Sequence, residues 1–224
     1  MRIRSFIIAY SLVLAILLFA DRRTGPAPQN RYTSVVDLTV VDDPAAQRAN
    51  PPASGTRIIS PAALIPGTWS AGQIPAERLI APLVVMDLKT TPGLKALPER
   101  AAQITLDDIA AWEEHNGVVP QGAVVAIRRA NAGKVASDAP LPITADAAQF
   151  LMDARYTLGF AIETPAKLSS DRGLSRQIAL HGNYVIEGAS RFTSIPETGS
   201  LVIVAPDKNK AVAEAPVRIL AMVR

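Results

Sequence analysis

Few side chains in this 224-residue sequence are suited to acid–base or nucleophilic chemistry. There are two histidines, His115 and His181, and no cysteine, so neither a thiolate nucleophile nor a thiolate metal site can form. His181 lies six residues before Glu187, and across a turn the two could pair, with His181 as a displaced general base. The alternative is a packed, hydrogen-bonded His181 without a catalytic role.

Serine and aspartate side chains offer weaker candidates. Ser60 and Ser175 lack a histidine partner and the Gly-x-Ser-x-Gly turn that would expose a nucleophile. Asp37 and Asp87 stand in or beside apolar strands and could form a carboxylate pair. Hydrogen bonding of these carboxylates to loop amides is the simpler explanation of their positions.

One segment has the spacing of a metal-binding motif without its ligands. Residues 53–64 read ASGTRIISPAAL, which resembles the signature His-x-Gly-Thr-His-x-Asp-x-Pro-x-His-Phe of the cyclase family. This family comprises metal-dependent hydrolases that include bacterial kynurenine formamidase. Gly55, Thr56 and Pro61 match the signature, whereas its four ligand positions are occupied by Ala53, Arg57, Ile59 and Ala63.

The changed positions predict the loss of the family reaction. A divalent metal needs imidazole or carboxylate ligands, which alanine and isoleucine do not provide, and arginine is a permanent cation. The resemblance also implies a His-x11-Glu pair for proton transfer, in which Glu187 remains but Ser175 replaces the histidine. The family would use zinc or manganese, and the altered motif predicts no cofactor in this chain.

Arg57 is the replaced ligand position with the most chemical interest. Its cation could take over the charge of the metal and bind Glu187 or Asp37. Alternatively, the side chain turns to solvent.

The resemblance extends over residues 34–223. It includes the Asp-Leu-Thr at 37–39, the Pro-Leu-Val-Val-Met-Asp at 82–87 and the segment 216–221. It implies a single compact α/β domain with a β-rich centre flanked by helices, often assembled as a homo-oligomer. Turn signals and apolar patterns agree: strands are expected at 35–41, 83–88, 123–127, 158–162, 184–186, 201–204 and 217–223, and helices at 74–79, 105–115 and 144–154.

The N-terminus predicts export or membrane anchoring. Arg2 and Arg4 precede an apolar run from residue 6 to residue 20, which as a helix would span roughly 22 Å. That length fits a signal peptide, whereas snorkelling arginines would allow an uncleaved anchor. We therefore expect a signal peptide or anchor helix at 1–23, a linker at 24–33 and a cyclase-like domain at 34–224.

These observations predict a cyclase-family pseudoenzyme that acts as a binding module or accessory subunit of a membrane complex. The domain would lie on the periplasmic side of a bacterial cytoplasmic membrane, or free in the periplasm. Two alternatives stay open: an arylformamidase-like amide or lactone hydrolase with a rebuilt site, and a small-molecule carrier in which Arg57 binds a carboxylate. The net charge is only +3, and no basic stripe with interleaved aromatic residues is present, so no nucleic-acid partner is expected.

Overall fold

The computed structural model describes residues 31–41, 55–88, 103–128, 141–163, 172–209 and 212–224. Their strands form one sheet in the order β1-β8-β2-β6-β5-β4-β3-β7, and a further pairing of β8 with β7 closes seven of the eight strands into a barrel. The strands are β1 (Ser34–Asp37), β2 (Arg57–Ile59), β3 (Ile80–Asp87), β4 (Val124–Arg128), β5 (Gly159–Ile162), β6 (Tyr184–Glu187), β7 (Ser200–Pro206) and β8 (Glu214–Val223).

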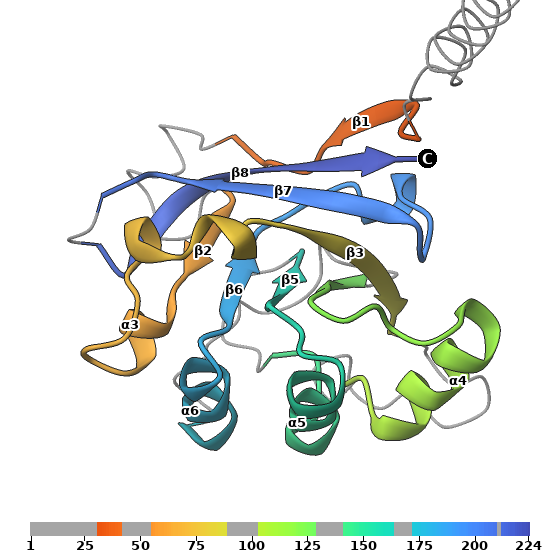
Figure 1. The fold of residues 1–224 in the computed structure, drawn as a ribbon, viewed down its shortest axis with the longest axis horizontal. Helices are drawn as coiled ribbons and strands as arrows, with labels where there is room; N and C mark the ends of the chain where they lie inside the picture. The colour runs from red at the N-terminus through yellow and green to blue at the C-terminus, as the bar shows by residue number, and fades with distance from the viewer. Residues whose placement is uncertain (1–30, 42–54, 89–102, 129–140, 164–171, 210–211) are drawn as a thin grey trace, which may run out of the picture. The chain divides into compact units, whose positions relative to one another are not determined.

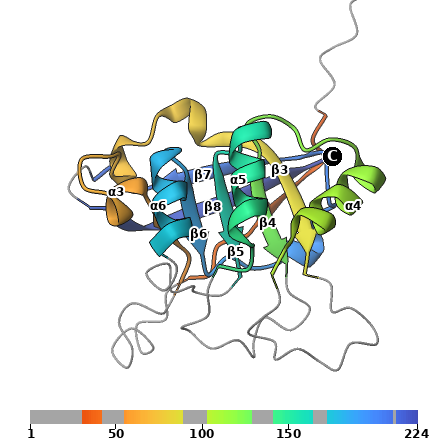
Figure 2. The same ribbon diagram turned by 90° about the horizontal axis from the view of Figure 1, so that it is seen from below.

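Helices cover the part of the barrel in which β3, β4, β5 and β6 run parallel. Figure 1 shows β1, β7 and β8 on the side away from α5 and α6, and Figure 2 shows the helices side by side over the parallel strands. The helices are α3 (Pro61–Leu64), α4 (Leu106–Asn116), α5 (Ala145–Ala154) and α6 (Arg172–Leu180), with short 3-10 turns η1 (Ala71–Gln73), η2 (Ala76–Arg78) and η6 (Phe192–Ser194).

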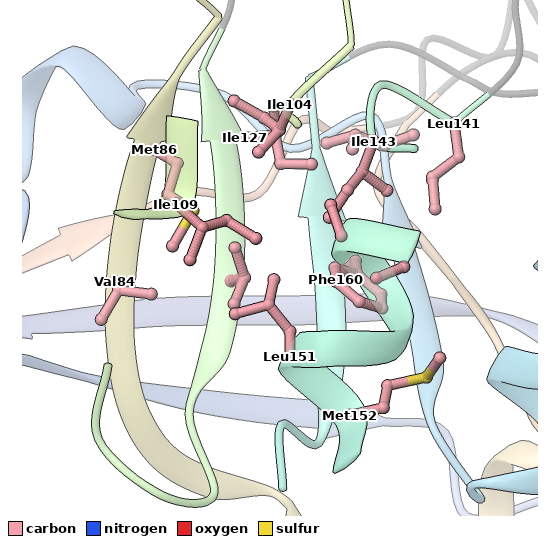
Figure 3. Close-up of a cluster of buried hydrophobic side chains, with 14 of the residues drawn as sticks. Val84, Met86, Ile104, Ile109, Ile127, Leu141, Ile143, Leu151, Met152 and Phe160 are labelled. Atoms are coloured by element: carbon pink, nitrogen blue, oxygen red, sulfur yellow. The ribbon is translucent and has the colours of Figure 1, made fainter. Parts of the chain in front are cut away.

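The apolar core has two parts, because alternate residues of each strand point to opposite faces. Val84 and Met86 belong to the cluster between the sheet and the helices, whereas Leu83 and Val85 belong to the cluster inside the barrel. Figure 3 shows the first cluster, in which side chains of β3, β4 and β5 meet those of α5. Both faces of the parallel strands are therefore buried, as their continuous apolar sequence predicts.

The predicted compact domain with a β-rich centre and flanking helices is confirmed. α4 begins where the sequence predicts, because Thr105 and Asp108 form a capping box at its start. β1 is shorter than expected. The carboxylate of Asp37 accepts a hydrogen bond from the Thr39 backbone N–H at 3.0 Å, which ends the strand in a local turn.

The predicted hydrophobic helix at 1–23 lies outside the described residues, as does most of the linker at 24–33. Tyr32–Arg224 forms a compact unit, close to the predicted domain. Across the described part of the chain, no helix has the length and apolar character needed to span a membrane.

Candidate functional site

The residues of the altered motif lie where β2 runs antiparallel to β6. Arg57 is opposite Glu187, and Ile59 is opposite Val185. α3 follows β2 and packs against α6, the helix that carries Ser175. We call these elements, β2, α3, α6 and β6, the motif region. All five predicted positions that the structure describes, 57, 59, 63, 175 and 187, are thus on these elements, whereas Ala53 lies outside the described residues.

Two former ligand positions of the motif region are packed in hydrocarbon. Ile59 is 9% exposed and belongs to the same buried cluster as Leu174 and Ile178 of α6. Ala63 packs against this cluster. Ser175 is also buried, with 6% exposure. Side chains that fill space between a strand and a helix stabilise the fold, but they supply no lone pairs to a metal ion.

Arg57 makes a different ion pair from the one predicted. Its Nη2 lies 3.9 Å from Oε2 of Glu214, and the two side chains are 25% and 50% exposed. Glu214 is not one of the two partners considered in the sequence analysis, and Asp37 instead binds Arg218. The reason is the third strand: Arg57 is also opposite Pro216 of β8, and Glu214 projects from the same face of β8 two residues earlier.

Asp37 lies on β1, and its contacts are with the neighbouring strand β8 and with the turn that follows β1. It forms an ion pair with Arg218 of β8, with 3.0 Å between Oδ2 and Nη2. Hydrogen bonds from Thr39, together with Arg218, lower the pKa of Asp37 below its ordinary value. The suggested carboxylate pair is not formed, because Asp87 instead binds Arg128 of β4 through both carboxylate oxygens.

His181 is held away from the role proposed for it. Its Nε2 lies 2.8 Å from Oδ1 of Asp153 on α5, and its Nδ1 lies 2.8 Å from the backbone oxygen of Gln177. With both ring nitrogens in these contacts, His181 corresponds to the hydrogen-bonded histidine that the sequence analysis gave as the alternative to a pair with Glu187. The cause is local: His181 directly follows the last residue of α6, and at this position its ring lies beside Asp153 of α5.

A pocket of about 170 Å³ lies elsewhere in the domain, between the end of β3 and α4. We call it the α4 pocket. It is lined by residues of three separate segments: Met86, Asp87, Ile104, Asp108, Ala111, Trp112, His115, Asn116 and Glu197. The sequence analysis missed it because Asp108 is explained by capping and His115 by the helix end. Only the parallel pairing of β3 and β4 and the return of residue 197 to β3 bring them together.

Comparisons with known proteins point to one family. The family model described as "Putative cyclase" matches residues 26–167. Isatin hydrolase A from Ralstonia solanacearum is similar in structure, with a TM-score of 0.67 and 23% identity over 85% of this chain and 92% of that chain. Isatin hydrolase A from Labrenzia aggregata, bound to benzyl benzoate, has a TM-score of 0.66 and 22% identity over 96% and 99%.

A third similar structure is described as a potential metal-dependent hydrolase with cyclase activity. It has a TM-score of 0.63 and 22% identity, over 85% of this chain and 98% of that chain. At these identities the likeness shows the fold. No curated protein matches the chain at a significant level.

This likeness corrects the prediction that the chain has no cofactor. Because a protein of the same fold is described as metal-dependent, the absence of a metal does not follow from an altered motif. Among the described residues, Arg57, Ile59 and Ala63 do not fit a metal ion, and no three His, Cys, Asp or Glu side chains are grouped to hold one. The metal state of the protein is thus a separate question from the state of its motif.

Proposed function

The chain belongs to the cyclase family, and from this premise we propose that it acts as a binding module or accessory subunit rather than as a hydrolase. The observation that carries the proposal is the packing of the motif region. Ile59 is buried with Leu174 and Ile178 at the position where the family has an aspartate ligand. A reaction that needs an activated water has no polar space at that position.

The groups that would transfer protons support the same proposal. Ser175 occupies the histidine position of the family pair, and a serine hydroxyl is a poor general base at neutral pH. His181, the only histidine near the end of α6, is bonded to Asp153 and Gln177. Glu187 is the member of the family pair that this chain retains, opposite Arg57.

Hydrolysis assays test the proposal directly. Purified full-length protein is incubated with isatin and with N-formylkynurenine, alone and with added Mn²⁺ or Zn²⁺, beside an authentic isatin hydrolase. We expect rates equal to those of the Glu187→Ala variant under every condition. Turnover that depends on metal and disappears in Glu187→Ala would instead establish the alternative function, a hydrolase with a rebuilt site.

The proposal includes a location at the bacterial cytoplasmic membrane, facing the periplasm, or release into the periplasm. It rests on the basic residues Arg2 and Arg4 before the apolar run, since positive charge favours the cytoplasmic side. N-terminal sequencing separates the two forms, because an anchor keeps the first residues and withstands a carbonate wash. A domain that intact spheroplasts protect from external protease, with Met1 retained, would contradict export.

The role of an accessory subunit predicts a stable membrane assembly. Membranes are extracted with a mild detergent, and the native mass of the complex is compared with that of purified protein in the same detergent. We expect the extracted protein to migrate in a larger complex that survives extraction. Identical migration of the extracted and purified protein would contradict this role while leaving the hydrolysis result intact.

A further inference from the structure

The α4 pocket differs from the motif region in place and in composition. It borders β3, which β4 and β5 separate from β6 in the sheet order. Its apolar wall includes Met86, Ile104 and Trp112, all largely buried. The indole N–H of Trp112 donates to the backbone oxygen of Val85 at 2.9 Å, so only the carbon surface of the ring is left for a ligand.

The polar side of the α4 pocket consists mainly of hydrogen-bond acceptors. Asp108 uses Oδ2 in the capping box with Thr105, and Glu197 uses Oε2 to accept from Nδ2 of Asn116 at 2.8 Å. The other carboxylate oxygen of each residue has no protein donor within the described part of the chain. These two oxygens come from α4 and from the segment before β7, so they approach the pocket from different elements.

The charges around the pocket do not cancel. Three carboxylates line it, those of Asp87, Asp108 and Glu197, and one arginine, Arg128, neutralises Asp87. Among the described residues, with the carboxylates ionised and His115 left out of the count, three negative charges less one positive charge leave a net charge of −2. A cation is attracted to such a site, and an anion is repelled.

We propose that the α4 pocket binds a small organic cation, with an ammonium or guanidinium group on a compact apolar body. The N–H donors would bond the open oxygens of Asp108 and Glu197, and the apolar body would lie against Trp112, Met86 and Ile104. A cavity of about 150 Å³ accepts a benzene ring, so a pocket of about 170 Å³ has room for one ring or a short chain. This site is independent of the function proposed above.

Matched probes test the charge preference. Benzylamine, which is a cation at pH 7, and the neutral benzyl alcohol have the same ring and nearly the same size. Full-length protein in mild detergent is titrated with each, and binding is followed by the indole N–H signal of Trp112 in NMR spectra. We expect benzylamine to bind at least about tenfold more tightly than benzyl alcohol, and less tightly as salt increases. Equal affinities, or a Trp112 signal that does not move, would overturn the proposal.

Variants locate the binding groups. Glu197→Gln keeps the contact with Asn116 but removes the charge, and Asp108→Asn removes the second charge. Each should weaken benzylamine binding about fivefold to tenfold, with no effect on benzyl alcohol. Glu77→Gln changes an exposed carboxylate of η2 outside the pocket and should leave both affinities unchanged. Thermal unfolding confirms that each variant is folded. Loss of benzylamine binding in Glu77→Gln, or its retention in Glu197→Gln, would contradict the assignment.

Discussion

The motif region and the α4 pocket lie on the same sheet, yet the first is packed with apolar side chains and the second is a cavity lined by carboxylates. In the motif region, Ile59 and Ala63 fill the space between β2 and the helices with hydrocarbon. At the α4 pocket, Asp87, Asp108 and Glu197 surround a hollow of about 170 Å³. The fold alone therefore does not fix where a polar cavity lies, because a few side chains decide whether a strand end is packed or open.

The largest effect is expected when a carboxylate replaces a buried apolar side chain of the motif region. Ile59→Asp should destabilise the domain by about 3–5 kcal/mol, because a buried group loses its apolar packing and a charge is left without partners. Ile59→Val is the matched control and should cost about 1 kcal/mol. Urea unfolding measures both. A cost below about 1 kcal/mol for Ile59→Asp, or full recovery on adding Mn²⁺ or Zn²⁺, would mean that the position still accepts polar chemistry.

The ion pair of Asp87 with Arg128 beside the α4 pocket should contribute more to the free energy of unfolding than an ion pair at the surface. In Asp87→Asn the guanidinium of Arg128, whose side chain is 19% exposed, loses its charged partner. We expect a loss of about 1–3 kcal/mol in the free energy of unfolding. Asp37→Asn removes the exposed pair with Arg218 and should cost under about 0.5 kcal/mol. Equal losses in the two variants would show that the ion pair at the end of β3 stabilises the domain no more than the exposed ion pair on β1.

Acid should weaken the attachment of α4 to the rest of the domain. The carboxylate of Glu113 accepts hydrogen bonds from Arg155 and from the Val119 backbone N–H, and Arg155 is the main cause of its lowered pKa. A lowered pKa stabilises the folded state above the ordinary pKa of 4.5, and this contribution is lost as pH falls through the lower folded value.

The free energy of unfolding, measured from pH 6 to pH 3, should therefore fall more steeply for the natural protein than for Glu113→Gln. We expect a difference of about 1 kcal/mol at pH 6 that shrinks towards pH 3. Glu114→Gln, on an exposed position of the same helix, is the control. Parallel curves for the natural protein and Glu113→Gln would remove Glu113 as a pH-sensitive group.

The smallest effect is expected at Arg57, although it occupies a former ligand position. Its partner Glu214 is half exposed and 3.9 Å away, so Arg57→Met should cost under about 1 kcal/mol. Arg176→Met on the exposed side of α6 is a control for loss of one surface charge. A loss of about 3 kcal/mol in chemical denaturation would mean that Arg57 neutralises a buried carboxylate after all.

Local signals in the sequence predicted the elements with their own caps and patterns. Thr105 and Asp108 predicted the start of α4, and the continuous apolar run at 83–88 predicted β3. β2 was not predicted, because three residues are too few for a periodic pattern. α6 was missed as well, although Leu174, Ile178 and Ala179 have the spacing of a buried helix face.

The candidate sites were harder to predict than the fold. The resemblance assigns Arg57 and Glu187 to one altered site, and the structure sets them opposite each other on β2 and β6. The partners of Arg57 and His181 could not be read from it, because Glu214 and Asp153 arrive from other elements through the sheet order and the packing of helices. The ion-pair partner of a side chain therefore depends on which charged groups the fold places near it.

β8, which closes the barrel, follows the other described strands in the sequence. β8 pairs with β1, β2 and β7, and the Thr39 hydroxyl donates to the backbone oxygen of Ile219 across a separation of 180 residues. Such distant partners make folding slow, because the loop must close before its contacts form. Until β8 has been synthesised, β1 therefore has no partner strand among the described residues, and β2 can pair only with β6. A barrel that is not yet closed exposes unpaired strand edges, and these need protection from aggregation until β8 has emerged.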